Sequence, residues 1–255
     1  MNPQIPPRTS LPGTRPQGAR DESEAARQVR EMFSRIAPRY DFLNHLLSLQ
    51  LDRLWRRRVA RRFRHILAQP DARALDVCCG TGDLAFALGA AGPARVFGAD
   101  FAHPMLVLAR QKVSARQGMK LGFLEADALA LPCPAASFDL ITTAFGFRNL
   151  ANYERGLREM YRVLRSSGEV GILEFAEPRG ALFAPLYRFY LTRLLPRVGG
   201  AISGNLAAYS YLPSSVERFP SPEELAALMS SVGFAEVRFE LWTCGSVALH
   251  TARRA

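Results

Sequence analysis

The segment ALDVCCGTGDLAFAL, from Ala74 to Leu88, combines an acid, two glycines and the start of a helix. Asp76 lies in an apolar run, Gly80 and Gly82 follow it, and a helical pattern begins near Asp83. Because glycine has no Cβ, the backbone at these two positions can approach a ligand closely. The free N–H groups at a helix N-terminus carry roughly half a positive charge. The segment therefore predicts a loop that holds a nucleotide-like ligand.

Two classes of ligand fit this loop, NAD and S-adenosylmethionine. The letters GTGDLA match the G-x-G-x-x-A pattern of dinucleotide binding. Asp83 would then lie beside the pyrophosphate and repel it. S-adenosylmethionine has no phosphate, and Asp76 is placed to hold its amino acid moiety. The charges favour this methyl donor, but Asp83 can equally be a simple helix cap, so an NAD-dependent oxidoreductase stays open as the alternative.

Two more acids end apolar segments further along the chain. Asp100 follows Gly82 by eighteen residues, and a carboxylate there can accept hydrogen bonds from both ribose hydroxyls. Asp127 is placed to accept from the adenine amino group while the backbone of Ala128 contacts the ring. An Asx turn is an equally good interpretation of Asp127.

The elements that must position these residues alternate between strand and helix. Apolar strands are expected over residues 73–80, 95–101, 121–129, 138–147 and 169–175. Helices are expected over residues 83–92, 103–118, 153–168 and 221–234. The last two segments, 235–242 and 246–254, alternate apolar and polar residues and predict an antiparallel hairpin. This order predicts an α/β fold with a doubly wound sheet and a ligand at the carboxyl ends of the strands.

Three regions fall outside this alternation. Residues 1–22 are rich in Pro, Arg and Gly and predict a disordered tail, which leaves residues 23–255 as one domain. Residues 23–70 predict N-terminal helices interrupted at Pro38 and around Asp41 to Asn44. The apolar and aromatic residues 181–219 predict a helical insertion over the active site.

The net charge of +10 comes almost entirely from arginine. Seven arginines lie between Arg53 and His65, on an apolar stripe with helical spacing. Such a basic amphipathic helix suits an anionic membrane surface, nucleic acid or a solvated face. Because the aromatic stacking motifs of common RNA-binding folds are missing, no nucleic acid partner is expected.

The four cysteines indicate neither disulfides nor a metal site. Cys78, Cys79, Cys133 and Cys244 form no CxxC pair. No apolar run reaches eighteen residues, so no membrane-spanning helix is expected. We expect a cytoplasmic protein, with peripheral contact at the inner face of the membrane, and the sequence leaves a homodimer open.

Five stretches carry the resemblance to one enzyme family: APRYDFLNHLLSLQLDRLWRR, LDVCCGTGDLA, EADALALPCPAASFDLITTAFGFRNL, EMYRVLRSSGEVGILEF and LPSSVERFPSPEELAALMSSVGF. Through them the chain, from about Val29 to His250, resembles the ubiquinone/menaquinone biosynthesis C-methyltransferases. These class I S-adenosylmethionine-dependent enzymes methylate a ring carbon of a polyprenyl quinol. The first stretch and FGFRN at residues 145–149 are specific to the family.

The resemblance implies a Rossmann-like methyltransferase fold with a seven-stranded sheet whose last strand is antiparallel. It implies cofactor contacts at Thr81, Asp100, Asp127 and Ala128, with Tyr40 closing over S-adenosylmethionine. The glycine loop would add Asp76, Gly80 and Gly82 to these contacts.

The acceptor must be an electron-rich quinol, because an oxidised quinone is a poor nucleophile. Arg148 is the candidate to stabilise the quinolate, and Asn149 the candidate to orient a ring oxygen or a water. The general base stays unassigned, since His45, His65 and His103 fit surface or structural positions better. We expect demethylmenaquinol as the acceptor, with 2-methoxy-6-polyprenyl-1,4-benzoquinol as the alternative.

The chain departs from the family pattern at a few positions. Leu43 replaces the usual Met, Asp52 the usual His, and Ser166 and Ser167 the usual Pro-Gly. Ala144 replaces a serine that often touches the cofactor, which removes one hydrogen bond worth about 1 kcal/mol. None of these changes removes the donor site, but Asp52 weakens any catalytic role for its position.

Overall fold

A seven-stranded sheet with the order β3-β2-β1-β4-β5-β7-β6 forms the centre of the molecule. The computed structural model describes residues 13–16, 18–48, 50–114, 119–178, 183–190, 193 and 206–255. The strands are β1 (Arg73–Val77), β2 (Arg95–Asp100), β3 (Leu121–Glu125), β4 (Phe138–Ala144), β5 (Leu164–Phe175), β6 (Phe234–Trp242) and β7 (Val247–Arg254). Only β7 runs antiparallel to its neighbours, β5 and β6, which confirms the predicted sheet and its terminal hairpin.

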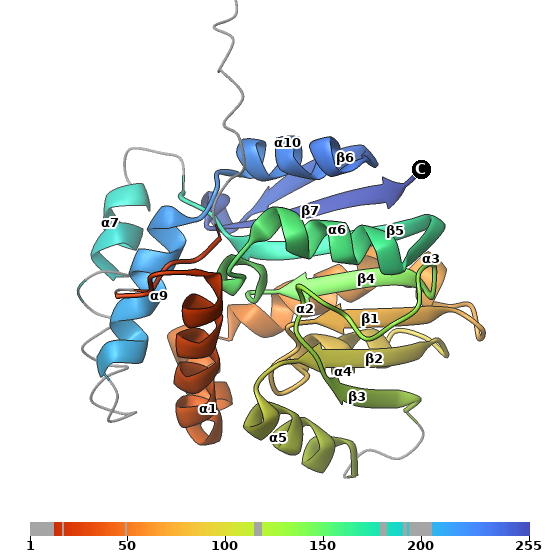
Figure 1. Cartoon of the computed structure of the whole chain (residues 1–255), viewed down its shortest axis with the longest axis horizontal. Coiled ribbons are helices and arrows are strands. Elements are labelled where there is room, and N and C mark those ends of the chain that lie inside the picture. Colours follow the sequence, from red (N-terminus) through yellow and green to blue (C-terminus); the bar gives the residue numbers. More distant parts are fainter. Residues whose placement is uncertain are drawn as a thin grey trace, which may run out of the picture.

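Helices pack on both faces of this sheet (Figure 1). The helices are α1 (Glu22–Leu47), α2 (Leu51–Arg62), α3 (Arg64–Leu67), α4 (Asp83–Gly89), α5 (His103–Ser114), α6 (Tyr153–Val163), α7 (Phe183–Phe189), α9 (Leu206–Arg218) and α10 (Pro222–Val232), with short turns η1 (Phe147–Asn149) and η3 (Thr243–Gly245). Helices α6 and α10 bury apolar side chains against one face, and α2, α3 and α4 against the other. Alternate strand residues, such as Ala74 and Leu75, therefore enter opposite cores.

Helix α1 continues through Pro38 and through residues 41–44, so both predicted interruptions are wrong. Ile36 and Ala37 are buried in a cluster with Met105 of α5, and this packing holds the helix together. Pro38 itself lies on the exposed side, where the carbonyl that loses its intrahelical partner can be solvated. The uninterrupted helix carries residues from the surface to the ligand-binding edge of the sheet.

Helix α6 ends at Val163, five residues before the predicted stop at Gly168. The chain enters β5 at once, and Leu164 pairs with Phe138 of β4. The register then shifts, with Ser167 at φ +62°. A Cβ on Gly168 would lie 2.9 Å from the carbonyl oxygen of Arg165. This glycine therefore serves an irregular stretch of strand rather than a helix end.

The N-terminal segment differs from the predicted disordered tail wherever the structure describes it. The Thr14 N–H donates to the Leu150 carbonyl at 2.7 Å, and the Arg15 guanidinium donates to the Ala151 carbonyl at 2.8 Å. Thr14 is only 7% exposed. Residues 1–12 lie outside the described residues. The segment 13–16 is thus fixed by backbone hydrogen bonds that composition alone does not reveal.

Helices α7 and α9 occupy the same side of the molecule as α1, on the left of Figure 1. Helix α9 contacts the turn η1, which follows β4. Part of the predicted insertion, including Leu194, lies outside the described residues. Among the described residues, none of the helices is both long and apolar enough to cross a membrane.

Candidate active site

The glycine loop between β1 and α4 adopts backbone conformations that favour glycine. Gly80 has φ +55° and Gly82 has φ +89°. A Cβ on Gly82 would lie 2.8 Å from the ring of Phe123, so the loop packs too tightly for any side chain there. A Cβ on Gly80 would point toward the ring of Tyr40, at 3.7 Å. Gly80 thereby leaves space between the loop and α1.

A cavity of about 640 Å³, including the open solvent at its mouth, lies in this space. Six of the residues predicted from the sequence line it: Tyr40, Gly80, Asp100, Asp127, Ala128 and Asn149. Apolar residues form most of the remaining wall, among them Phe33, Phe101, Met105 and Phe145. Two carboxylates lie in the wall, and among the residues that the structure describes no lysine or arginine lines it. This lining suits a cationic or neutral ligand and disfavours a diphosphate.

Asp100 is held at the carboxyl end of β2 by two backbone donors. Gly80 donates to its Oδ2 at 2.8 Å, and Ala102 donates to its Oδ1 at 2.9 Å. Burial raises the pKa of Asp100 above its ordinary value, although these two N–H groups pull it the other way. Each carboxylate oxygen retains a lone pair, so Asp100 can still accept hydrogen bonds from a diol in the cavity.

Asp127 forms an Asx turn, which is the alternative to cofactor binding that the sequence offers for this residue. Its Oδ1 accepts from the Leu129 N–H at 2.9 Å. Because Asp127 and Ala128 also line the cavity, the turn fixes the carboxylate at the wall, and the two interpretations are compatible.

Asp76 does not line the cavity and is only 1% exposed. Its Oδ1 accepts from the Thr142 hydroxyl at 3.0 Å, whereas its Oδ2 is buried without a partner among the described residues. Burial raises the pKa of Asp76 from 3.8 to about 7. The structure therefore places this acid beneath the glycine loop, behind the residues that could touch a ligand.

Lys112 of α5 links the C-terminal end of α1 to the glycine loop through ion pairs and a hydrogen bond. Its Nζ lies 2.7 Å from Asp41 Oδ2 and 3.0 Å from Asp83 Oδ1, and it donates to the Thr81 hydroxyl at 2.9 Å. The Thr81 hydroxyl in turn donates to Asp41. Thr81, expected to contact the cofactor, thus joins the loop to α1 one residue beyond Tyr40. We call the set of Asp41, Thr81, Asp83 and Lys112 the α1 clasp.

A second group of charges extends the α1 clasp toward α2. His45, Asp52 and Asp83 place ligand-type atoms within 4.8 Å of one another. Arg56 bonds to Asp52 and lies 3.8 Å from Asp83, so a guanidinium already supplies the positive charge that a metal ion would bring. Burial alone would raise the pKa of both acids, but Arg56 and their hydrogen-bond donors lower it below the ordinary value.

These ion pairs change the electrostatic argument against a dinucleotide. Asp83 is compensated by Arg56 and Lys112, so it is not the bare charge that the sequence suggested. The case against phosphate is carried instead by the cavity lining, which in the part of the chain that the structure describes contains Asp100 and Asp127 but no lysine or arginine.

Arg148 lies behind the cavity wall, paired with a buried acid. Its Nη1 is 3.0 Å from Glu174 Oε2, and its guanidinium lies over the Phe175 ring at 5.2 Å from the centroid. It also donates to the Phe145 carbonyl. Burial would lower the pKa of Arg148, but Glu174 raises it above the ordinary value. The pair shapes the turn that presents Asn149.

Sequence reasoning missed the residues that complete this side of the site. Glu174 ends a buried strand and gave no pattern that marked it as a partner of Arg148. Tyr211 of α9 donates to Asn149 Oδ1 at 3.1 Å across 62 positions in the chain. Cys78 lines the cavity, and burial raises the pKa of its thiol well above the ordinary value. None of the three histidines weighed as a general base lines the cavity.

Comparison with known proteins places this site in a family. The model of the ubiE/COQ5 methyltransferase family matches residues 20–254. The chain belongs to the ubiE/COQ5 methyltransferase family. A demethylmenaquinone methyltransferase from Thermus thermophilus is 54% identical over 224 residues, which cover 88% of this chain and 100% of that protein. A ubiquinone/menaquinone biosynthesis C-methyltransferase from Geotalea daltonii is 42% identical and covers 91% of this chain and 98% of its own length.

Solved structures share the fold of this ubiE/COQ5 family member at low identity. A SAM-dependent methyltransferase from Aquifex aeolicus has a TM-score of 0.55 and 19% identity, covering 78% of this chain and 89% of its own. The [4+2]-cyclase SpnF has a TM-score of 0.60 and 17% identity, covering 96% and 99%. The fold alone therefore does not decide the reaction.

Proposed function

We propose that the protein transfers a methyl group from S-adenosylmethionine to a ring carbon of a polyprenyl quinol, with demethylmenaquinol as the acceptor. The observation that carries this proposal is the cavity wall, where, among the described residues, Asp100 and Asp127 lie with apolar side chains and without a lysine or arginine. A phosphate-free, cationic adenosine compound fits such a wall. Relatives at 54% and 49% identity that bear the name demethylmenaquinone methyltransferase support the choice of acceptor.

The residues of the cavity divide the task of holding the donor. Asp100 would accept from the ribose hydroxyls, and Asp127 with Ala128 would hold the adenine. Tyr40 and Phe33 of α1, whose rings lie 5.9 Å apart edge to face, would cover the donor and exclude water. Bound S-adenosylmethionine supplies an electrophilic methyl group on a sulfonium.

The protein must also keep its own nucleophiles out of the reaction. Cys78 lies in the cavity wall, and a thiolate there would compete for the methyl group. Burial and the nearby charges of Asp100 and Asp76 keep the Cys78 thiol protonated, because they raise its pKa well above the ordinary value. A protonated thiol is a weak nucleophile, so the methyl group is left for the acceptor.

Asn149 is the polar contact for the acceptor in this proposal. Its amide donates weakly to the Phe145 carbonyl at 3.5 Å, and the side chain lines the cavity. An amide N–H donated to a ring oxygen would stabilise the quinolate. Arg148 would keep a positive charge behind this turn, although Glu174 balances it. Arg148 then acts by shaping the turn more than by direct contact.

The test is an assay with purified protein, S-adenosylmethionine and chemically reduced demethylmenaquinone in detergent. Mass spectrometry should show a gain of one CH₂ unit on the naphthoquinone. Parallel reactions with the methoxy-polyprenyl benzoquinol and with oxidised demethylmenaquinone should give little product. Faster methylation of the benzoquinol would reassign the acceptor, and binding of NADH without binding of S-adenosylmethionine would overturn the function.

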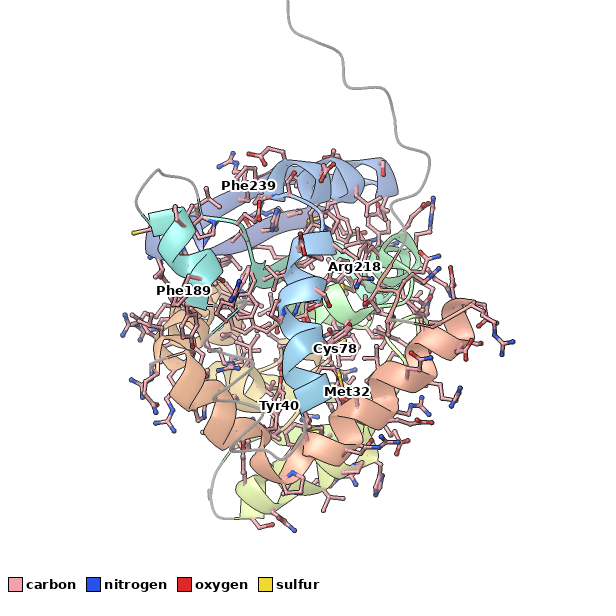
Figure 2. All side chains as sticks on the ribbon, turned by 90° about the vertical axis from the view of Figure 1, so that its left-hand side faces the viewer. Met32, Tyr40, Cys78, Phe189, Arg218 and Phe239 are labelled. Atoms are coloured by element: carbon pink, nitrogen blue, oxygen red, sulfur yellow. The ribbon has the colours of Figure 1, made fainter. Side chains whose placement is uncertain are left out.

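We also propose that the protein meets its lipid-soluble acceptor at an anionic membrane surface. Six of the seven arginines between Arg53 and His65 are exposed, whereas Arg56 is buried. Leu54 beside them is 54% exposed, and Phe189 of α7 is 59% exposed. Figure 2 shows Phe189 on the side of the molecule that also carries α2. Exposed cations flanked by apolar side chains suit an interfacial contact.

Vesicle flotation tests this contact. Each basic residue near an anionic leaflet contributes about 1 kcal/mol, so Arg57→Glu with Arg61→Glu should weaken binding by about thirtyfold or more. The matched control, Arg110→Glu with Lys120→Glu, makes the same change in charge near β3 and should leave binding within a few-fold of the wild type. Equal binding to anionic and neutral vesicles would contradict the proposal.

A further inference from the structure

Three side chains from distant parts of the sequence form a hydrogen-bonded row that ends at the cavity. Thr14 Oγ1 lies 2.8 Å from Tyr211 Oη, and Tyr211 Oη lies 3.1 Å from Asn149 Oδ1. Thr14 is 7% exposed and Asn149 is 9% exposed. Helix α9, which carries Tyr211, crosses the side of the molecule seen in Figure 2 in front of Tyr40 and Cys78, both of which line the cavity.

The donors and acceptors in this row follow from the orientation of the Asn149 amide, whose nitrogen faces the Phe145 carbonyl. The oxygen of a carboxamide only accepts, so Tyr211 must donate its single proton to Asn149 Oδ1. The hydrogen bond between Thr14 and Tyr211 then requires Thr14 to be the donor. Burial raises the pKa of Tyr211 above its ordinary value, so the phenol keeps this proton at neutral pH.

Thr14 is itself held in place by the backbone. Its N–H donates to the Leu150 carbonyl at 2.7 Å. Gly13 packs so closely that a Cβ would lie 2.0 Å from the Ala151 carbonyl carbon. On the other side, Arg218 of α9 donates to the Arg15 carbonyl at 2.7 Å. The N-terminal segment is therefore hydrogen-bonded both to the turn that follows β4 and to α9.

We propose that Tyr211 is a positioning residue that fixes the orientation of the Asn149 amide, with Thr14 of the N-terminal segment holding Tyr211. This inference rests on the proposed role of Asn149 toward the quinol. A phenol that donates to Oδ1 leaves the two amide N–H groups for the Phe145 carbonyl and for the cavity. The flipped amide would present its oxygen to a quinolate, which repels it. The Phe145 carbonyl can only accept, so it keeps the amide nitrogen on its side. Together with the proton that Tyr211 donates to Oδ1, it favours the orientation that stabilises negative charge on the acceptor.

Activity is measured for Tyr211→Phe, Thr14→Val and the control Tyr161→Phe. Tyr161 lies on α6 against Phe234, away from the cavity. We expect kcat to fall about five- to tenfold in Y211F and about two- to threefold in T14V, with the KM for S-adenosylmethionine unchanged. Y161F should keep the wild-type kcat. Adding Y211F to Asn149→Ala should lower kcat less than twofold further, because Tyr211 acts through Asn149.

A spectroscopic readout follows the amide without any turnover. The side-chain ¹⁵N–¹H resonances of Asn149 are assigned by their loss in N149A. They should shift in Y211F and in T14V but not in Y161F. Unchanged resonances in Y211F would overturn the positioning role. It would also be overturned if the loss of kcat in the double variant equalled the product of the losses in Y211F and N149A, because the two residues would then act independently. Failure of the proposed function looks different, since the wild-type protein would then not methylate demethylmenaquinol although the resonances shift.

Discussion

Replacing Asp76 by Asn tests whether this acid serves the fold or the cofactor. The sequence places Asp76 among the cofactor contacts, whereas the structure buries it beneath the glycine loop with Oδ2 unpartnered. Asparagine has nearly the same shape and its oxygen can still accept from Thr142. The substitution therefore removes the titrating proton and leaves the packing of the loop in place.

The expected change in folding stability follows from the pKa of Asp76, which burial raises from 3.8 to about 7. One pKa unit corresponds to about 1.36 kcal/mol, so ionised Asp76 costs about 4 kcal/mol of folding free energy above pH 7. The native state binds this proton more tightly than the unfolded chain does. Stability of the ligand-free wild type should therefore fall as pH rises from about 4 to 7. In D76N this contribution is missing.

Urea unfolding of ligand-free D76N and wild type between pH 4 and pH 8 measures the difference. We expect D76N to be less stable than the wild type by up to about 1 kcal/mol near pH 4, because the additional N–H has no partner. At pH 8 it should be more stable by about 3 kcal/mol, because the same cost is set against the gain of about 4 kcal/mol. Asp71→Asn, at an exposed position, should leave the pH profile unchanged. A difference that does not grow with pH would refute the reasoning about burial. Calorimetry with S-adenosylmethionine adds the second test, because a loss of binding in D76N would show that Asp76 reaches the ligand.

Three further substitutions address the rest of the site. Glu174→Ala should cost about 3–5 kcal/mol in urea unfolding, because it leaves the Arg148 guanidinium buried without its counter-charge. Gly80→Ala should raise the Kd of S-adenosylmethionine about tenfold, as measured by calorimetry. The reason is that φ at this position is +55° and the new Cβ would face Tyr40 at 3.7 Å. Unchanged affinity would contradict the assignment of the cavity to the donor. Lys112→Met should lower the free energy of unfolding by about 1–3 kcal/mol, because it removes the ion pairs and the hydrogen bond of the α1 clasp. It should also speed dissociation of S-adenosylmethionine in stopped-flow mixing. An unchanged dissociation rate would show that the α1 clasp does not control release.

The sheet and the cavity-lining residues of the glycine loop and strand ends were predictable because their signals are local. The strand before Gly80 and the helix after Gly82 are close in sequence, and the acids at the ends of β2 and β3 follow by simple spacing. The helix expected over residues 221–234 corresponds to α10, and the structure shows a capping box of Ser221 and Glu224 at its start. Each of these signals depends on backbone conformation within a few residues.

The errors arose where distant contacts outweigh local preference. Pro38 should break a helix, but Ile36 and Ala37 pack against α5 and the helix continues. Gly168 should end a helix, but pairing of Leu164 with Phe138 draws the chain into β5 earlier. Composition predicted a disordered tail over residues 1–22, but Thr14 and Arg15 donate to carbonyl groups 136 positions away. No short window of sequence contains these partners.

The acceptor side of the site is the part least visible in the sequence, and there is a physical reason. The proposed donor contacts come from one loop and two strand ends, whereas the Asn149 amide is contacted by Tyr211 of α9, which is held by Thr14 near the N-terminus. These parts meet only in the folded chain. SpnF, a cyclase with a similar fold, illustrates that the sheet does not dictate the reaction. We therefore expect acceptor choice to be altered through α9 and the N-terminal segment, and donor affinity through the glycine loop and α1.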